Sequence, residues 1–173
     1  AAMEQRINEI LEFVELTDRA DDKSRRYSGG MKRRLMIGMA LLHKPKMLFL
    51  DEPTVGLDPQ VRRKMWDLIR KMNEAGMTVL LTTHYIEEAD QLCRRVAIMN
   101  RGRIIAVDTP QKLKEKVGRV VVEHMEADGM INNFFDNREQ AASYVAGLNS
   151  NATVREANLE DVFIELTGRR VND

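Results

Sequence analysis

The chain has 173 residues, of which 43% are hydrophobic and 31% are charged, a composition typical of a folded protein rather than a disordered one. The charges of its 27 basic and 27 acidic residues cancel. The chain therefore lacks the overall positive charge that is typical of nucleic-acid-binding proteins. A single cysteine excludes an intrachain disulfide framework, and the apolar runs are far shorter than the roughly 18 residues of a membrane span. No glycine precedes a lysine, so the Gly-Lys pair of a phosphate-binding P-loop is absent.

Two helices are predicted in the first quarter of the chain. Apolar residues recur at helical spacing over 3–16, and a second helical pattern runs over 31–43 behind Ser28, a suitable N-cap. Ser28, Gly29 and Gly30 would present backbone N–H groups to a phosphate, although an ordinary capped turn is the simpler interpretation of these three residues alone. The basic residues 25–26 and 32–34 are predicted to form a solvated face.

A strand, a helix and a second strand are predicted next. Residues 47–50 form a short, uninterrupted apolar run, which indicates a strand buried on both faces, and residues 77–82 have the same character. An amphipathic helix over 61–72 lies between them and ends at Gly76. A crossover of this length predicts a βαβ unit with parallel strands.

Polar residues follow both predicted strands. Asp51 and Glu52 end the first strand, and His84 follows the second. The carboxyl ends of parallel strands share one rim of a sheet, where ligands collect. Asp51 would suit magnesium near phosphates, Glu52 could activate a water, and His84 could donate to a γ-phosphate. Each residue alone is as easily structural, and their occurrence together favours the functional interpretation.

The rest of the chain is predicted to contain further short elements. They are a helix over 85–92, a hairpin of residues 96–99 and 103–107, and a helix that opens at Thr109-Pro110. The pattern changes at Gly118, which divides the sequence into a main α/β domain over 1–117 and a small α+β appendage over 118–173.

In this order, the motifs resemble those of the ATP-binding subunits of ABC transporters over nearly the whole chain. Tyr27 and Met31 stand where the signature motif usually has leucine and glutamine, a variant that resembles the drug- and antibiotic-exporter branch. Residues 158–168 resemble the tail of the same branch. The matching segments are residues 27–31 (signature), 47–52 (Walker B), 53–58 (the stretch into the D-loop) and 83–84 (switch histidine).

The resemblance implies the C-terminal part of an ABC ATPase domain, because Walker A and the glutamine loop are missing before the signature. The expected fold is a partial P-loop-NTPase-like parallel sheet with helices, followed by the small α+β appendage. Alone, such a piece is expected to be inactive.

The resemblance also implies a mechanism in which two subunits sandwich two ATP molecules head to tail. Asp51 would hold Mg²⁺ through water, Glu52 would polarise the attacking water, and His84 would contact the γ-phosphate. Asp58 would couple the two sites. The residues expected to complete the partner's nucleotide site are Ser28, Gly29, Gly30 and Met31, the last without the usual side-chain amide.

The expected partners are a second ATP-binding subunit and transmembrane permease subunits, with the protein on the cytoplasmic, inner face of the cell membrane. No nucleic acid is expected. Two alternatives remain open: half of a split ABC-type ATPase of DNA repair and chromosome maintenance, and a non-catalytic regulatory module. The predicted hairpin and the exporter-like tail favour a role in transport.

Overall fold

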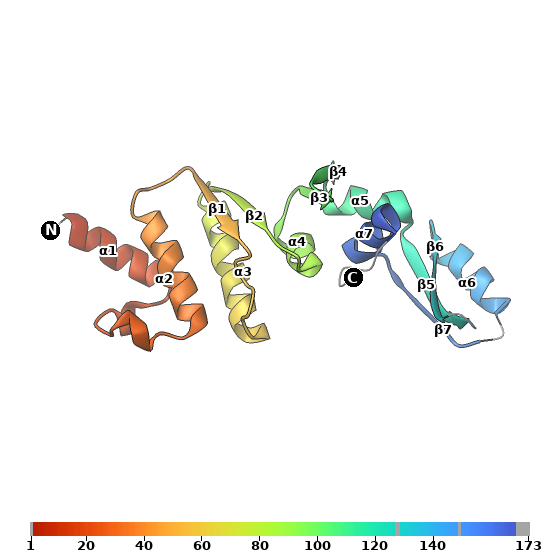
Figure 1. Cartoon of the computed structure of the whole chain (residues 1–173), viewed down its shortest axis with the longest axis horizontal. Coiled ribbons are helices and arrows are strands. Elements are labelled where there is room, and N and C mark those ends of the chain that lie inside the picture. The colour runs from red at the N-terminus through yellow and green to blue at the C-terminus, as the bar shows by residue number, and fades with distance from the viewer. Residues whose placement is uncertain (1, 127–128, 149, 169–173) are drawn as a thin grey trace. The chain divides into compact units, whose positions relative to one another are not determined.

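The computed structural model describes residues 2–126, 129–148 and 150–168. The chain forms two compact units that divide between His84 and Tyr85. Figure 1 labels the helices and strands of both units and colours them in chain order. The first unit contains α1 (Ala2–Phe13), α2 (Gly29–Leu41), β1 (Met47–Asp51), α3 (Pro59–Glu74) and β2 (Thr78–Thr82).

The βαβ prediction is confirmed in the first unit. β1 and β2 are parallel neighbours in register from Met47 opposite Thr78 to Asp51 opposite Thr82, and α3 is the crossover. The apolar positions of α3 recur on one side of the helix, so a single face enters the core. The buried residues of that face are Met65, Trp66, Leu68, Ile69 and Met72.

The prediction that residues 47–50 are buried on both faces is wrong for this unit. Leu48 is buried, whereas Phe49 next to it is 68% exposed and Leu80 on β2 is 51% exposed. Successive strand residues point to opposite faces, so one face of this two-stranded sheet is covered and the other is open. The apolar run therefore makes both faces of the strand hydrophobic, and this unit covers only one of them.

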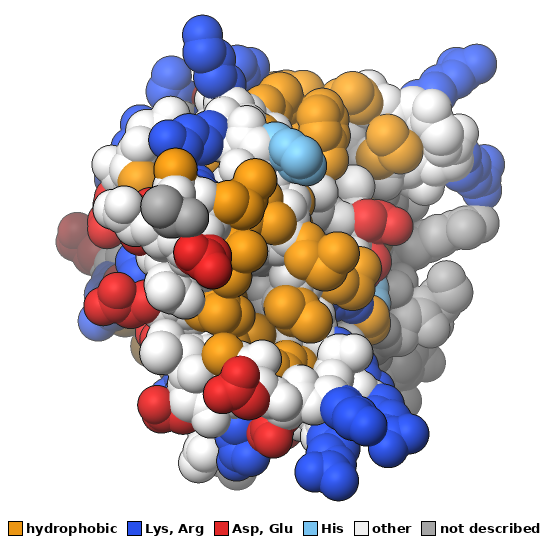
Figure 2. Space-filling view, turned by 90° about the vertical axis from the view of Figure 1, so that its left-hand side faces the viewer, with side chains coloured by type: hydrophobic (Ala, Val, Ile, Leu, Met, Phe, Trp, Pro, Cys, Tyr) orange, Lys and Arg blue, Asp and Glu red, His pale blue; other side chains and the backbone are white. Residues whose placement is uncertain are grey.

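The helices α1 and α2 pack closely because Gly38 carries no side chain. A Cβ at Gly38 would lie 3.0 Å from Ile10 and 3.4 Å from Val14. The outer side of this pair is also apolar, and Met36 and Met39 of α2 are about three-fifths exposed. Figure 2 shows hydrophobic side chains gathered on this side of the first unit.

The second unit begins with a short helix and a hairpin, and further helices and a small three-stranded sheet follow. Its hydrophobic cores gather around Leu113 and Val162 and around Val122 and Ala141. β3 and β4 form the predicted antiparallel hairpin, and β6, β5 and β7 form an antiparallel sheet in that order. The elements are α4 (Ile86–Leu92), β3 (Val96–Asn100), β4 (Arg103–Asp108), α5 (Pro110–Val117), β5 (Val120–Glu126), β6 (Gly129–Phe135), α6 (Arg138–Ala146), β7 (Ala152–Glu156) and α7 (Leu159–Thr167).

The second unit spans the predicted boundary at residue 118. Leu113 of α5 lies in the same core cluster as Leu159 and Val162 of α7. Helices on either side of the predicted boundary therefore share a core. The division into domains over 1–117 and 118–173 stays a prediction about the complete fold.

An ion-pair network joins β5, β7 and α7. Both terminal nitrogens of Arg155 donate to the carboxylate of Asp161 at 2.7 and 2.8 Å, and Arg155 also pairs with Glu123. Asp161 is almost fully buried and accepts from the backbone N–H of Asn158 as part of a capping box. The hydrogen bonds to Asp161 raise the pKa of Arg155 above its usual value, at which an arginine is already charged.

Replacing Asp161 with alanine is expected to destabilise the second unit by about 3 kcal/mol, because Arg155 loses its bidentate partner and α7 loses its cap. Urea unfolding followed by circular dichroism measures the loss. Trp66 is the single tryptophan and lies in the first unit, so its fluorescence should show an unchanged transition. Glu160→Ala, at an exposed neighbour, is the control. Equal effects of the two substitutions would contradict the assignment.

Candidate functional site

The ends of β1 and β2 form one rim that holds the predicted polar residues. Asp51 lies opposite Thr82 in the strand register, and the Thr82 hydroxyl donates a hydrogen bond to Asp51 Oδ1. The backbone N–H of Glu52 then donates to the Thr82 carbonyl at 3.0 Å. Thr82 was not singled out in the sequence, because its role depends only on which residue it faces.

Glu52 and His84 form a close pair on this rim. His84 Nδ1 lies 2.9 Å from Glu52 Oε2, and the His84 backbone N–H donates to the same oxygen at 3.4 Å. The Glu52 side chain is 32% exposed and that of His84 is 54% exposed, so a ligand in solvent can reach both. The structure therefore brings together Asp51, Glu52 and His84, as the sequence predicts.

Glu52 has a left-handed backbone with φ of +45°. Such a conformation in a residue other than glycine costs roughly 1–3 kcal/mol and persists only where surrounding contacts hold it. The Glu52 carbonyl accepts from the backbone N–H of Val55 and from Arg33 Nη2, each at 3.3 Å. These contacts hold the turn that redirects the chain after β1.

The predicted solvated face over residues 25–26 and 32–34 is wrong for Arg33 and Arg34. Arg33 is partly buried and contacts the Glu52 carbonyl. Arg34 donates to the carbonyls of Val14 and Glu15 just after α1 and pairs with the Glu15 carboxylate at 3.1 Å. Carbonyls beyond a helix end lack intrahelical donors, and a guanidinium group can satisfy several of them. Arg25, Arg26 and Lys32 are exposed as predicted.

Ser28 caps α2 as predicted. Its hydroxyl oxygen accepts from the backbone N–H of Met31 at 3.3 Å. Gly29 has open space around it, whereas a Cβ on Gly30 would lie 2.4 Å from Val61 Cγ1 on α3. The two glycines thus have different roles in this structure: Gly29 leaves the helix N-terminus accessible, and Gly30 lets α2 approach α3.

Asp58 is the N-cap of α3. Its Oδ1 accepts from the backbone N–H groups of Gln60 at 3.1 Å and Val61 at 3.0 Å. The family resemblance implies only a coupling role for Asp58 between two subunits. The sequence does contain a signal for this cap, because an aspartate followed by proline at the first helical position is a common helix start.

The described residues contain no group of three or more His, Cys, Asp or Glu side chains that could hold a metal ion. Asp51 is the exposed carboxylate at the rim. Magnesium commonly keeps several waters and uses one or two carboxylates together with substrate phosphates. A single carboxylate beside the Thr82 hydroxyl fits that mode of binding, and it would not hold the ion by itself.

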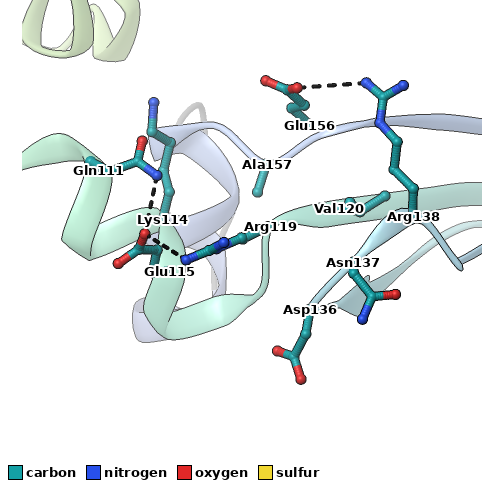
Figure 3. A pocket seen from close by; sticks show the side chains of 10 residues that line it. All are labelled: Gln111, Lys114, Glu115, Arg119, Val120, Asp136, Asn137, Arg138, Glu156 and Ala157. Atoms are coloured by element: carbon teal, nitrogen blue, oxygen red, sulfur yellow. Dashed lines mark hydrogen bonds and ion pairs between the residues drawn. The ribbon is translucent and has the colours of Figure 1, made fainter. Parts of the chain in front are cut away.

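A pocket of about 340 Å³ in the second unit was not anticipated (Figure 3). Its cations already have carboxylate partners. Arg119 pairs with Glu115 at 3.0 Å and Arg138 with Glu156 at 3.6 Å, as Figure 3 shows. Lys114, which also lines the pocket, pairs with Asp90 at 3.0 Å. This pocket therefore lacks an excess of charge that would select a charged ligand.

Within the ranges described, every helix is too short or too polar to cross a membrane.

Gly30→Ala is expected to destabilise the first unit by about 1–3 kcal/mol, because Val61 is stiff on its helix and cannot easily turn away. Gly29→Ala is the matched control and should leave stability unchanged or slightly higher. Chemical denaturation followed by Trp66 fluorescence measures both variants. The loss should shrink when Gly30→Ala is combined with Val61→Ala, and a loss that is unaffected by this second change would point away from the steric contact.

The ABC transporter family matches residues 2–55. The linearmycin resistance ATP-binding protein LnrL of Bacillus subtilis is 37% identical over 98% of this chain and 65% of its own length. The Nod factor export ATP-binding protein I of Cupriavidus metallidurans is 39% identical over 100% of this chain and 64% of its own length. The chain thus spans slightly less than two thirds of these relatives.

A solved structure gives the same result for the fold. The CbiO1 protein of Clostridium perfringens, part of the ABC transporter complex CbiONQ, matches with a TM-score of 0.60 and 32% identity. The match covers 64% of this chain and 44% of that protein. The order of the motifs, the parallel β1–β2 rim and these matches agree: the relatives of this chain are ATP-binding proteins of ABC transporters, and its residues 2–55 match that family.

Proposed function

We propose that this chain is part of an ABC-type ATPase that powers export through transmembrane permease subunits. The observation that carries the proposal is the rim where Asp51, Glu52 and His84 meet at the carboxyl ends of two parallel strands. Two relatives are named for resistance to linearmycin and for export of Nod factor, which supports an exporter. The protein would work at the cytoplasmic face of the cell membrane.

Glu52 would orient and polarise the water that attacks the γ-phosphate of ATP. Its carboxylate is partly exposed and its main chain is held by hydrogen bonds, so the group is accessible and fixed in position. His84 would donate to the γ-phosphate. Because its ring now contacts Glu52 at 2.9 Å, binding of ATP would exchange this contact for one to phosphate. Positioning and charge stabilisation supply most of the catalysis in such reactions.

Asp51 would hold Mg²⁺ through water, with the Thr82 hydroxyl keeping its carboxylate in one orientation. The bound ion would neutralise charge on the phosphates. This arrangement needs phosphate oxygens as further ligands, in line with the lack of a three-residue metal cluster among the described residues.

Ser28, Gly29 and Gly30 would complete the nucleotide site of a second ATP-binding subunit in a head-to-tail dimer. The open space at Gly29 and the N–H groups at the N-terminus of α2 suit a phosphate. Met31 would contribute its backbone. Asp58 would couple the two sites across the interface in addition to capping α3.

The lysine-bearing phosphate loop would come from polypeptide outside this sequence, because the chain has no Gly-Lys pair. The open apolar face of the β1–β2 sheet supports this proposal. Phe49 and Leu80 on that face are more than half exposed, and apolar patches of this kind favour a covering layer. This chain together with that P-loop-bearing polypeptide would form the complete subunit.

The 173-residue chain alone is expected to have negligible ATPase activity, because no lysine is placed to hold the β- and γ-phosphates. Phosphate release by the purified chain measures this, with Glu52→Gln as the control for contaminating enzymes. Robust turnover that Glu52→Gln abolishes would refute the prediction.

The complete subunit is expected to hydrolyse ATP, and Glu52→Gln should lower its turnover by at least ~100-fold, since the amide is a poor base for the attacking water. The same variant should form a stable dimer with ATP, because closure no longer ends in hydrolysis. Size-exclusion chromatography with and without ATP tests the dimer. A variant that stays monomeric with ATP would argue against the head-to-tail arrangement.

A further inference from the structure

Arg33 connects α2 to the main chain at the end of β1. It lies one turn beyond the Ser28-Gly29-Gly30 start of α2, and its Nη2 donates to the Glu52 carbonyl at 3.3 Å. The side chain is partly buried. A hydrogen bond from a guanidinium group is stronger than one between neutral groups, and partial burial reduces competition from water.

The Glu52 backbone depends on contacts from three parts of the first unit. Its N–H donates to the Thr82 carbonyl on β2, and its carbonyl accepts from the Val55 N–H in the following turn. Arg33 supplies a third contact, from a helix that is distant in sequence. A left-handed residue with a side chain requires such surrounding contacts.

We propose that Arg33 is a positioning residue for Glu52. By holding the Glu52 carbonyl, it sets the orientation of the peptide after Glu52 and the direction in which the carboxylate leaves the main chain. This inference rests on the proposed function, in which that carboxylate orients the attacking water. It adds a physical link between the phosphate-binding start of α2 and the reacting side chain of the same subunit.

The packing of α2 supports this link. Gly30 lies against Val61 with no room for a Cβ, so the start of α2 is held tightly against α3. A small shift of α2, when Ser28 and Gly29 contact nucleotide in the partner's site, would move Arg33 and the Glu52 carbonyl with it. A displacement of about 1 Å at a reacting group can change a rate by roughly 100-fold.

Steady-state kinetics of the complete subunit test the role of Arg33. Arg33→Ala should lower kcat by roughly ten- to a hundredfold and leave the KM for ATP within about twofold, since it misplaces a group needed after ATP is bound. Arg33→Lys should recover part of kcat, because an ammonium group can also donate to the carbonyl. Arg70→Ala, which removes a half-exposed arginine on α3, should leave both constants unchanged.

Hydrogen exchange on the 173-residue chain tests the contact without any activity. In Arg33→Ala, the amides of Glu52 and Val55 should exchange about tenfold faster, the change expected for losing one charge-assisted hydrogen bond. Amides of α7 in the second unit should be unaffected. If the alanine variant does not fold, Arg33→Lys is measured in the same way, and exchange at Glu52 and Val55 should be faster than in the wild type.

The two experiments separate the possible failures. Unchanged exchange at Glu52 and Val55 in Arg33→Ala would overturn the inference. An unchanged kcat in Arg33→Ala, while Glu52→Gln is inactive, would overturn it too. A complete subunit that is inactive as wild type would refute the proposed function, and the exchange data would still decide whether Arg33 holds Glu52.

Discussion

The parallel register of β1 and β2 is the constraint on which the rest of the first unit depends. It places Asp51 opposite Thr82, so that the hydroxyl and the carbonyl of one threonine bind two successive residues of the other strand. A slip of one residue would turn Asp51 to the other face and separate Glu52 from His84. The chemistry proposed for the rim therefore depends on a backbone pairing as much as on the acidic and imidazole groups.

The helix α2 contacts both α3 and the turn that follows β1 at this rim. Gly30 allows close approach to α3, and Arg33 reaches the turn after β1 from the same helix. Arg34 binds the carbonyls that follow α1. The two adjacent arginines thus connect α2 to two different segments, the turn after β1 and the end of α1. Arg33 and Arg34, which look like part of a solvated face in the sequence, are thus structural connections, because a guanidinium group carries several N–H donors that can reach main-chain carbonyls.

The first unit also leaves apolar side chains exposed on one face of its β1–β2 sheet. Phe49 and Leu80 are apolar on a sheet face that this unit does not cover. The second unit is stabilised from within, by two hydrophobic clusters and by the Arg155 network that connects β5, β7 and α7. The contrast fits a chain that spans less than two thirds of its relatives.

The sequence by itself determined the local features of this protein. Helical periodicity, the Ser28 cap, the βαβ unit and the placing of Asp51, Glu52 and His84 at one rim all follow from residue order, because strand ends and helix caps are set by neighbouring residues. Only the tertiary structure decided the pairing of Thr82 with Asp51, the target of Arg33 and which face of β1 is covered. These depend on contacts between residues that are distant in sequence, and an apolar or basic residue does not specify which distant group it will meet.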